Sequence, residues 1–372
     1  MISPREISRL FRTAQNIDPT LSIKPRSLPK LSGLAIEAGK YNRNRLFKNM
    51  ATGKISIFED FPSPLRTARQ RNLTNPTALI LDTLYHSDIQ DRIRTKSGKK
   101  GAWKYFTISE LAEKWRRKKA NINVTDLHFR DTLIENVIDA KRLSQFNLYP
   151  CSTEHTAWLE MMTLVVSSRA GFSDSHSDDS DGSNHCFTGK KLWLAWDTNE
   201  GIANGLEDLD RQKIAGKCAF DVETYLSLQS ACWFTIGTGQ TLFMPGHLTH
   251  KVLTLEPYLG VGSFYLAFPN LLRTLTRWLA HSPNWEKLER KGYRDLVYPD
   301  LIKAAVKKLK TLQHATENSK LIWGLDYLKY AINAWNRQTA NAEKQKLLEL
   351  EGWGKRDNIA QDDINLLWLA TR

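Results

Sequence analysis

Short runs in which hydrophobic and polar residues alternate dominate the middle of the chain, from Trp158 onward. The runs read LEMMTLVVSS, CFTGKKLWLAW, CWFTI, QTLFMP, HKVLTL and LGVGSFYLAF, and turns rich in Gly, Pro, Ser and Asp separate most of them. Alternation with a period of two residues is typical of strands that bury one face. Many short strands with such turns predict a β-sandwich or a jelly-roll barrel in this part of the chain.

The segments on either side of this region have other patterns. Apolar residues three and four positions apart predict helices over 301–312 and 321–338. Residues 1–75 have no long helical or strand period, so we expect a loosely organised arm. Before the β region, the sequence predicts helices over 76–91, 107–119 and 131–146, a strand over 121–129, and a basic loop over 92–104.

These patterns together predict an α+β fold in three parts. A basic N-terminal arm with one or more helices occupies residues 1–104. A β-barrel domain with flanking helices follows at 105–270, and a helical C-terminal subdomain at 271–372.

Composition narrows the class of protein. Hydrophobic residues make up 41% of 372 residues and include 12 Trp, so a disordered chain is excluded. No apolar run approaches the roughly 18 residues that span a bilayer, and the N-terminus lacks a signal-peptide core. The four Cys show no CxxC spacing, which argues against a zinc site or a disulfide framework. We therefore expect an intracellular protein with no membrane partner.

The net charge of +13 is unevenly distributed. Residues 1–150 hold 28 Lys and Arg against 14 Asp and Glu, whereas residues 151–270 hold 7 against 14. A basic flank of this kind favours a polyanionic partner, and nucleic acid is the leading candidate. The alternative for the basic cluster at 116–119 is a solvated helix end that complements the helix dipole.

The candidate chemistry lies in FSDSHSDDSDGSNHCFTGKKLWLAW, residues 172–196. His176 and Asp178 form a His-x-Asp pair next to a predicted strand, where residues i and i+2 point to the same side. His250 begins another predicted strand after a Pro-Gly turn. Two His and one carboxylate on a β scaffold leave positions open on a metal, as in non-haem Fe(II) oxygenases. About one His-x-acid pair is expected by chance among nine His and 40 acidic residues, and His86-Ser87-Asp88 is such a pair on a predicted helix.

Two further features are informative only because they lie near the candidate metal ligands in the sequence. In KKLWLAW, Lys191 shares one strand face with Trp193, while Lys190 lies on the other, so one ammonium group can point into a barrel. Paired lysines are otherwise common at solvated strand ends. Trp193, Trp233 and Phe243 are candidates for lining a cavity, although aromatic residues at strand spacing more often form the core.

Residues 172–196 and 236–268 resemble the JmjC (Jumonji C) domain of Fe(II)/2-oxoglutarate oxygenases. The likeness is strongest to the branch of F-box and PHD-finger histone lysine demethylases, and it covers roughly residues 105–280. It is carried by the Phe-Ser-Asp-x-His-x-Asp entry, the Gly-x-Lys turn, Gly-Gln-Thr-Leu-Phe-x-Pro-Gly before the distal histidine, and the Gly-Val-Gly-Ser-Phe strand.

The resemblance implies a double-stranded β-helix, of the jelly-roll or cupin-like kind, and assigns roles to residues. His176, Asp178 and His250 fall on the iron ligands, and Lys191 falls on the lysine that binds the 2-oxoglutarate carboxylate. Ser173 takes the place of a hydroxyl residue that supports this carboxylate. Asn184 stands where that branch has a cosubstrate-binding Tyr. These six residues are the candidate site for Fe(II) and 2-oxoglutarate.

The function that the resemblance implies is a nuclear dioxygenase that hydroxylates or demethylates lysine in a protein, with a histone tail as the candidate substrate. Two alternatives remain open. One is a catalytically silent JmjC-like protein that binds chromatin or nucleic acid through its basic N-terminal region. The other is a hydroxylase that leaves a stable hydroxyl group on a protein or nucleic acid. The sequence leaves the substrate and the oligomeric state undetermined.

Overall fold

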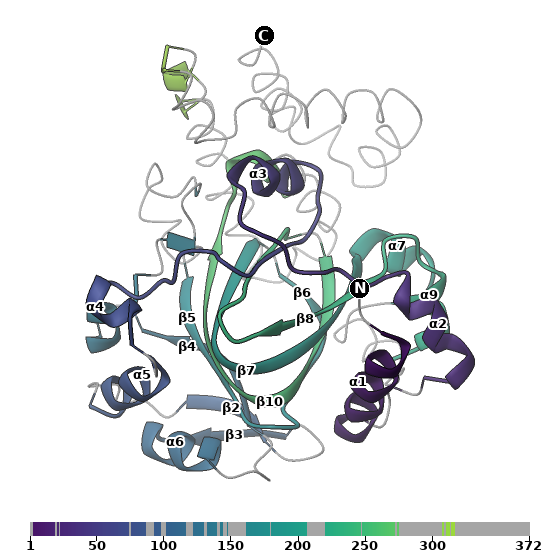
Figure 1. Cartoon of the computed structure of the whole chain (residues 1–372), viewed down its shortest axis with the longest axis horizontal. Coiled ribbons are helices and arrows are strands. Elements are labelled where there is room, and N and C mark those ends of the chain that lie inside the picture. Colours follow the sequence, from purple (N-terminus) through teal and green to yellow (C-terminus); the bar gives the residue numbers. More distant parts are fainter. Residues whose placement is uncertain are drawn as a thin grey trace, which may run out of the picture.

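The computed structural model describes residues 3–274 with gaps, the longest at 148–160 and 207–219, and parts of 307–316. Helices and strands are mixed, which confirms the α+β class (Figure 1). The helices are α1 (Pro4–Ile17), α2 (Leu28–Ser32), α3 (Arg43–Ala51), α4 (Ala68–Arg71), α5 (Pro76–Tyr85), α6 (Ile108–Arg116), α7 (Thr198–Ala203) and α9 (Val222–Ser227), with 3-10 turns η1 (Pro25–Ser27), η2 (Leu133–Asn136) and η6 (Phe268–Asn270).

The ten named strands of the described residues belong to one antiparallel sheet. They are β1 (Ser56–Phe58), β2 (Ile93–Ser97), β3 (Ala102–Phe106), β4 (Ile122–His128), β5 (Met161–Ser167), β6 (Phe172–Ser177), β7 (Asp181–Asp197), β8 (Cys232–Gly237), β9 (Thr241–Met244) and β10 (Leu248–Tyr265). Eight of them follow the order β1-β9-β7-β10-β5-β4-β2-β3, while β6 pairs with β10 and β8 pairs with β7 beside this path.

The two long strands β7 and β10 hold the sheet together. They pair with each other from Leu248 opposite Asp197 to Tyr265 opposite Asp181. At one end of this ribbon β6 and β8 lie on its flanks, and at the other end β5 and β9 do so. The ribbon therefore belongs to two four-stranded groups, β6-β10-β7-β8 and β9-β7-β10-β5. Figure 1 shows that β7 and β10 curve strongly between them.

The apolar side chains divide according to the face of the ribbon. Trp193, Ala195 and Phe234 belong to a core cluster that also contains Val252 and Tyr258. The face of the ribbon that carries this cluster is called the inner face. Leu192, Leu194 and Trp196 alternate with the residues of this cluster and pack on the other side with α1 and α9. This alternation follows from the period of two along a strand and was visible in the sequence.

The expectation of a loosely organised N-terminal arm is wrong. Ser3 and Glu6 form a capping box at the start of α1, with Pro4 at the first helical position. Ile7, Phe11 and Ala14 lie on one face of α1 and are almost completely buried. Because α1 and α2 cover the outer face of β7, β8 and β10, this segment is part of the core.

Two other predictions are also wrong, and a third lies partly outside the described residues. The basic stretch 92–104 is not a loop, because β2 and β3 form an antiparallel hairpin there. The helix predicted over 131–146 is replaced, in its described part, by the 3-10 turn η2. The predicted helix 301–312 is helical where it is described, at 307–308 and 310–312, while 321–338 lies outside the described residues. Helix α6 and strand β4 are confirmed.

Candidate metal centre and polar pocket

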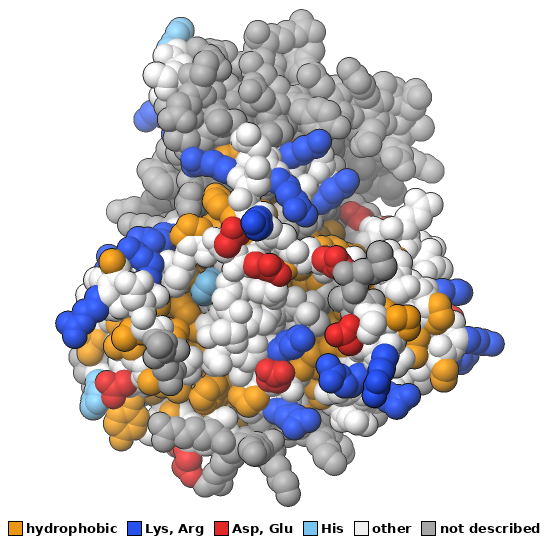
Figure 2. Space-filling view, viewed as in Figure 1, with side chains coloured by type: hydrophobic (Ala, Val, Ile, Leu, Met, Phe, Trp, Pro, Cys, Tyr) orange, Lys and Arg blue, Asp and Glu red, His pale blue; other side chains and the backbone are white. Residues whose placement is uncertain are grey.

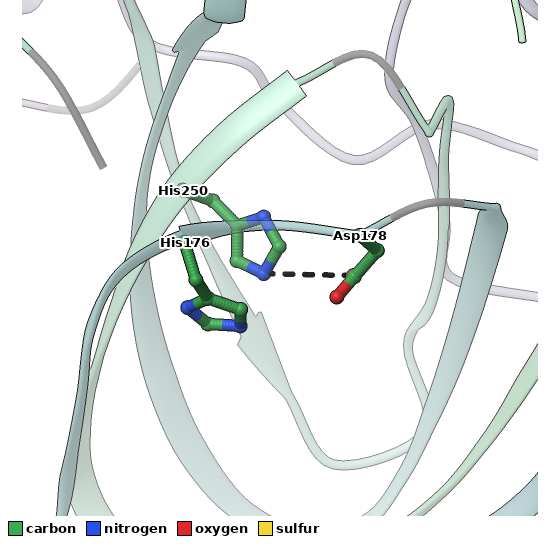
Figure 3. A group of neighbouring side chains, drawn as sticks. All are labelled: His176, Asp178 and His250. Atoms are coloured by element: carbon green, nitrogen blue, oxygen red, sulfur yellow. Dashed lines mark ion pairs between the residues drawn. The ribbon is translucent and has the colours of Figure 1, made fainter. Parts of the chain in front are cut away.

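The three predicted metal ligands come together at the pairing of β6 with β10. His176 lies in β6 directly opposite His250 of β10, and Asp178 follows the end of β6. Figure 3 shows the three side chains pointing toward one another. Residues that pair in register project to the same face of a sheet, so the cross-strand pairing itself brings the two imidazoles together.

A bulge in β6 orients the first imidazole. His250 pairs with His176, but Val252 pairs with Ser173, so β6 has one extra residue between these pairs. In this irregular stretch the carbonyl oxygen of Asp174 lies 2.7 Å from Nδ1 of His176. A carbonyl oxygen can only accept a hydrogen bond, so Nδ1 carries the proton and Nε2 is left with a lone pair for a metal.

The second imidazole is held in the same way, although more loosely. Nδ1 of His250 lies 3.4 Å from the carbonyl oxygen of Leu248, two residues earlier, and the His250 side chain is buried. The ring centroids of His176 and His250 are 4.3 Å apart. Both rings can therefore present Nε2 to a shared point.

The carboxylate completes a group that could hold a metal ion. Oδ2 of Asp178 lies 3.8 Å from Nε2 of His250, and the ligand atoms of the three residues all lie within 4.8 Å of one another. Metal–nitrogen and metal–oxygen bonds of about 2.1 Å allow two donors of one ion to be up to about 4.2 Å apart. A small side-chain movement would thus bring all three groups onto one ion.

Aromatic residues form the wall beside this group. The ring of Trp193 lies 5.1 Å from the ring of His250 and stacks on Phe234 at 6.0 Å. Trp233 and Phe243, the other two aromatic candidates, belong to core clusters on the opposite side of the strands. Only Trp193 of the three thus adjoins the candidate metal ligands.

Lys191 lies deeper on the same inner face. Its residue is only 3% exposed, and its Nζ lies 4.8 Å from the centre of the Tyr258 ring. Lys190 is half-buried and pairs in register with Glu256 and Gly237. Since strand neighbours point to opposite faces, the structure places Lys191 inside and Lys190 outside, in the arrangement that the alternation predicted.

The other two candidate residues lie on the inner face as well. Ser173 pairs in register with Val252, and its Oγ accepts a hydrogen bond of 2.8 Å from Nδ2 of Asn123. Asn184 is buried, and its Oδ1 accepts a hydrogen bond from the hydroxyl of Tyr258. Ser173, Asn184, Lys191 and the metal ligands thus line one side of the same two strand groups.

The side chains of Ser173, Asn184 and Lys191 with their neighbours form a polar cluster, and two of these neighbours escaped the sequence analysis. Tyr258 contacts both Asn184 and Lys191 and is completely buried. Asn123 of β4 bonds Ser173 and also accepts from Ser167. Asn123 lies in a predicted strand, but nothing in its local pattern distinguishes it. Only the pairing of β4 with β5 brings it beside β6.

Two further titratable groups lie near Lys191. Loss of hydration raises the pKa of the Cys186 thiol to about 12, and it raises the pKa of Tyr258 well above its ordinary value. Both groups are neutral at pH 7 with or without this rise in pKa.

Two buried polar atoms on the inner face have no hydrogen-bond partner among the described residues. They are Oγ1 of Thr254 and Nε1 of Trp193. Thr254 pairs in register with Lys191, and Trp193 adjoins His250. A buried donor without a partner costs about 1–3 kcal/mol, so each of these atoms is available to hydrogen-bond a polar ligand.

The remaining histidines of interest lie elsewhere. His86 follows α5 at the surface, 3.7 Å from Asp82, as expected for a chance His-x-Asp pair. His247 lies outside the described residues.

No family model and no curated protein matches the chain. Among the described residues, no helix is both long enough and apolar enough to cross a membrane.

Proposed function

We propose that the chain is an Fe(II)- and 2-oxoglutarate-dependent dioxygenase of JmjC type that hydroxylates and demethylates lysine in a protein. The observation that carries the proposal is the shared inner face of β6, β7 and β10. His176, Asp178 and His250 converge at one end of this face, and a buried Lys191 lies deeper on it.

The strand pairing supports a jelly-roll barrel as the scaffold. A double-stranded β-helix consists of two four-stranded antiparallel sheets that face each other. The two groups β6-β10-β7-β8 and β9-β7-β10-β5 have this composition, and the curvature of β7 and β10 turns one group toward the other. Metal ligands at strand ends of such a scaffold are held rigidly.

The donor set fits Fe(II). Two imidazole nitrogens and one carboxylate oxygen on one side of an ion leave three positions open for exchangeable ligands. Carbonyl oxygens hold Nδ1 of both imidazoles, which leaves Nε2 of each for the ion. Asp178 is more exposed than His250, so the ion would be approached from the Asp178 side.

The chemistry of the polar cluster around Lys191 suits the distal carboxylate of 2-oxoglutarate. Lys191 supplies the positive charge as a compact ammonium group. The unpartnered Thr254 hydroxyl lies opposite Lys191 and can donate to the same carboxylate. Ser173 and Asn184 line the same face, and each is already oriented by a neighbour, Asn123 or Tyr258.

When bound, Fe(II) and 2-oxoglutarate would supply the activation of dioxygen, in which the 2-oxo acid becomes succinate and carbon dioxide and one oxygen atom enters a substrate C–H bond. The chain's own residues bind, orient and exclude water. Lys191 fixes the cosubstrate, and Trp193 stacked on Phe234 keeps the pocket apolar beside His250. An N-methyl group hydroxylated there would leave as formaldehyde.

Charge supports a basic peptide as substrate and a polyanion as partner. The segment 151–270, which carries the candidate site, is net acidic and complements a lysine-rich histone tail. The N-terminal 150 residues are net basic, and Figure 2 shows Lys and Arg gathered over α3 and beside α4. This distribution suits chromatin and hence a nuclear location.

The test of the enzyme proposal is the Fe(II)-dependent formation of succinate from 2-oxoglutarate. We expect turnover by the wild-type chain and none above background by His176→Ala. His86→Ala is the matched control, because His86 is an exposed member of a chance His-x-Asp pair. Equal succinate formation by wild type and His176→Ala would refute the enzyme proposal.

The products distinguish the remaining alternatives. Mass spectrometry of a methylated histone peptide would show loss of a methyl group, with formaldehyde released, if the chain demethylates. Gain of one oxygen atom without loss of methyl would indicate a stable hydroxylation. Metal binding without turnover of 2-oxoglutarate would leave the silent JmjC-like binding protein. That protein should bind nucleic acid with an affinity that falls steeply as salt rises.

A further inference from the structure

A buried ion pair lies directly behind the candidate metal centre. Lys251 follows His250 in β10, so its side chain points to the opposite face of the strand. Its Nζ lies 2.7 Å from Oδ2 of Asp18, and each of the two side chains is only 5% exposed. Either charge alone would be costly to bury, so the two side chains must stay in contact. The pair therefore fixes the distance between Asp18 and strand β10.

The carboxylate of this pair comes from the N-terminal segment. Asp18 is the C-cap of α1, and its backbone N–H donates to the carbonyl of Ala14. Helix α1 in turn is anchored by Phe11, whose ring packs edge-on against Trp233 at 5.2 Å. The position of Asp18 is therefore set by a helix that is itself packed on the sheet.

The ammonium group adjoins the strands of both histidines. Lys251 lies between His250 and Val252, where the register of β10 against β6 shifts. Its Nζ is 5.6 Å from the ring of Phe172, the first residue of β6, and 6.0 Å from the ring of Phe220. The bulge turns the Asp174 carbonyl toward His176 on the inner face of the sheet. The buried ion pair thus lies on the opposite face at the same position along β10.

We propose that Asp18 is a positioning residue for the metal centre, acting through Lys251 on the β6–β10 pairing that sets the distance between His176 and His250. The N-terminal segment then contributes to the geometry of the metal site, although it supplies no metal ligand. This inference rests on the metal-binding part of the proposed function and on neither the cosubstrate nor the substrate.

The central experiment is titration with Mn(II), a redox-stable substitute for Fe(II), without 2-oxoglutarate. Asp18→Asn has nearly the same shape but leaves the Lys251 charge without its counter-charge. We expect the Mn(II) dissociation constant of this variant to rise about tenfold, since residues that orient metal ligands typically change affinity by 10–100-fold. In the double variant Asp18→Leu/Lys251→Met, both charges are gone and the affinity should recover to within about threefold of wild type.

Two further variants separate positioning from general stability. Leu111→Ala removes packing in a core cluster that contains no residue of α1, so it should lower the melting temperature and leave the Mn(II) affinity unchanged. Asp18→Glu keeps the charge, and so it serves if Asp18→Asn does not fold. The extra methylene moves the ammonium group, and we expect the Mn(II) affinity to fall about threefold.

Wild-type Mn(II) affinity in Asp18→Asn and Asp18→Glu would overturn the inference. Equal weakening in Leu111→Ala would overturn it too, because general destabilisation would then explain the loss. The outcome is independent of turnover. If His176→Ala binds Mn(II) as tightly as wild type, the metal site itself is wrong, which is a different failure.

Discussion

Replacement of Gly260 by Ala tests the polar cluster around Lys191 and Tyr258 with a single added methyl group. A Cβ at Gly260 would lie 2.7 Å from Cε1 of Tyr258, 2.8 Å from the carbonyl oxygen of His185 and 2.9 Å from Oη of Tyr258. All three distances are shorter than real Cβ contacts. The Tyr258 ring therefore lies directly against the Cα of Gly260. It can take this position only because glycine has no side chain.

The same strand offers a matched control two residues further on. A Cβ at Gly262 would lie 3.3 Å from the carbonyl oxygen of Ser183 and 3.3 Å from Oγ1 of Thr163, which small shifts can accommodate. Neither Gly260 nor Gly262 has a positive φ, so backbone strain does not distinguish the two variants. A difference between Gly260→Ala and Gly262→Ala therefore reports on the contacts with the Tyr258 side chain and with the carbonyl oxygen of His185.

We expect Gly260→Ala to lower the free energy of unfolding by about 1–3 kcal/mol, the usual cost of overpacking a core. Gly262→Ala should cost less. Displacement of the ring in Gly260→Ala should also weaken the binding of 2-oxoglutarate to the Mn(II)-loaded protein, because the Tyr258 ring lies against Lys191 and its hydroxyl holds Asn184. Mn(II) affinity should not change, since the metal ligands lie nearer the other end of β10.

The assays are chemical denaturation and calorimetric titration of 2-oxoglutarate without oxygen. The reasoning is refuted if Gly260→Ala and Gly262→Ala are equally stable and bind 2-oxoglutarate equally well. It is also refuted if Gly260→Ala loses Mn(II) and 2-oxoglutarate affinity in parallel, because the polar cluster would then not be separable from the metal centre.

Three other predictions concern the metal, the lysine and pH. Mn(II) at about 100 times its dissociation constant should stabilise the wild-type chain by about 2.7 kcal/mol, and this gain, measured by calorimetry, should vanish in His176→Ala. Lys191→Met should raise the dissociation constant of 2-oxoglutarate at unchanged Mn(II) affinity, whereas Lys190→Met should alter neither; equal effects would contradict the inward placement of Lys191. Burial lowers the pKa of His185 from 6.5 to about 4, so the unfolded chain binds more protons between these values, and stability should fall by up to about 3 kcal/mol as pH decreases from 6.5 to 4. This loss, followed by urea denaturation, should shrink in His185→Gln; an unchanged pH profile would exclude His185 as its source.

The sequence predicted most reliably where the period of two is strict. The run KKLWLAW predicted that Lys190 and Lys191 point to opposite faces of a strand, but only the resemblance indicated Lys191 as the inward one. The long strand β10 was recognised only as two pieces, because Glu256 and Pro257 interrupt the alternation where the register with β7 shifts. Local pattern cannot reveal that two such pieces form one curved strand.

The failures have two physical causes. The hairpin of β2 and β3 is rich in Lys and Arg, and its strand character comes from pairing with β4, which a basic composition conceals. Helix α1 did carry local signals, namely the Ser3–Glu6 capping box and the spacing of its buried residues, but scattered polar residues around it obscured them. Its partner Lys251, 233 residues away in sequence, could be found only from the tertiary structure.

Under the proposed function, the ribbon of β7 and β10 sets the spacing between the metal ligands and the residues that would hold the distal carboxylate. His250 and Thr254 are four residues apart on one face of β10, which corresponds to about 13 Å of strand at 3.3 Å per residue. In the absence of a bulge, this span changes only in steps of two residues, about 6.6 Å, because a step of one residue would turn the side chains to the opposite face. If the proposed function holds, gradual adjustment of the backbone would not accommodate a shorter or longer acid, and a preference for an acid of neighbouring length would come from the side chains at the two ends.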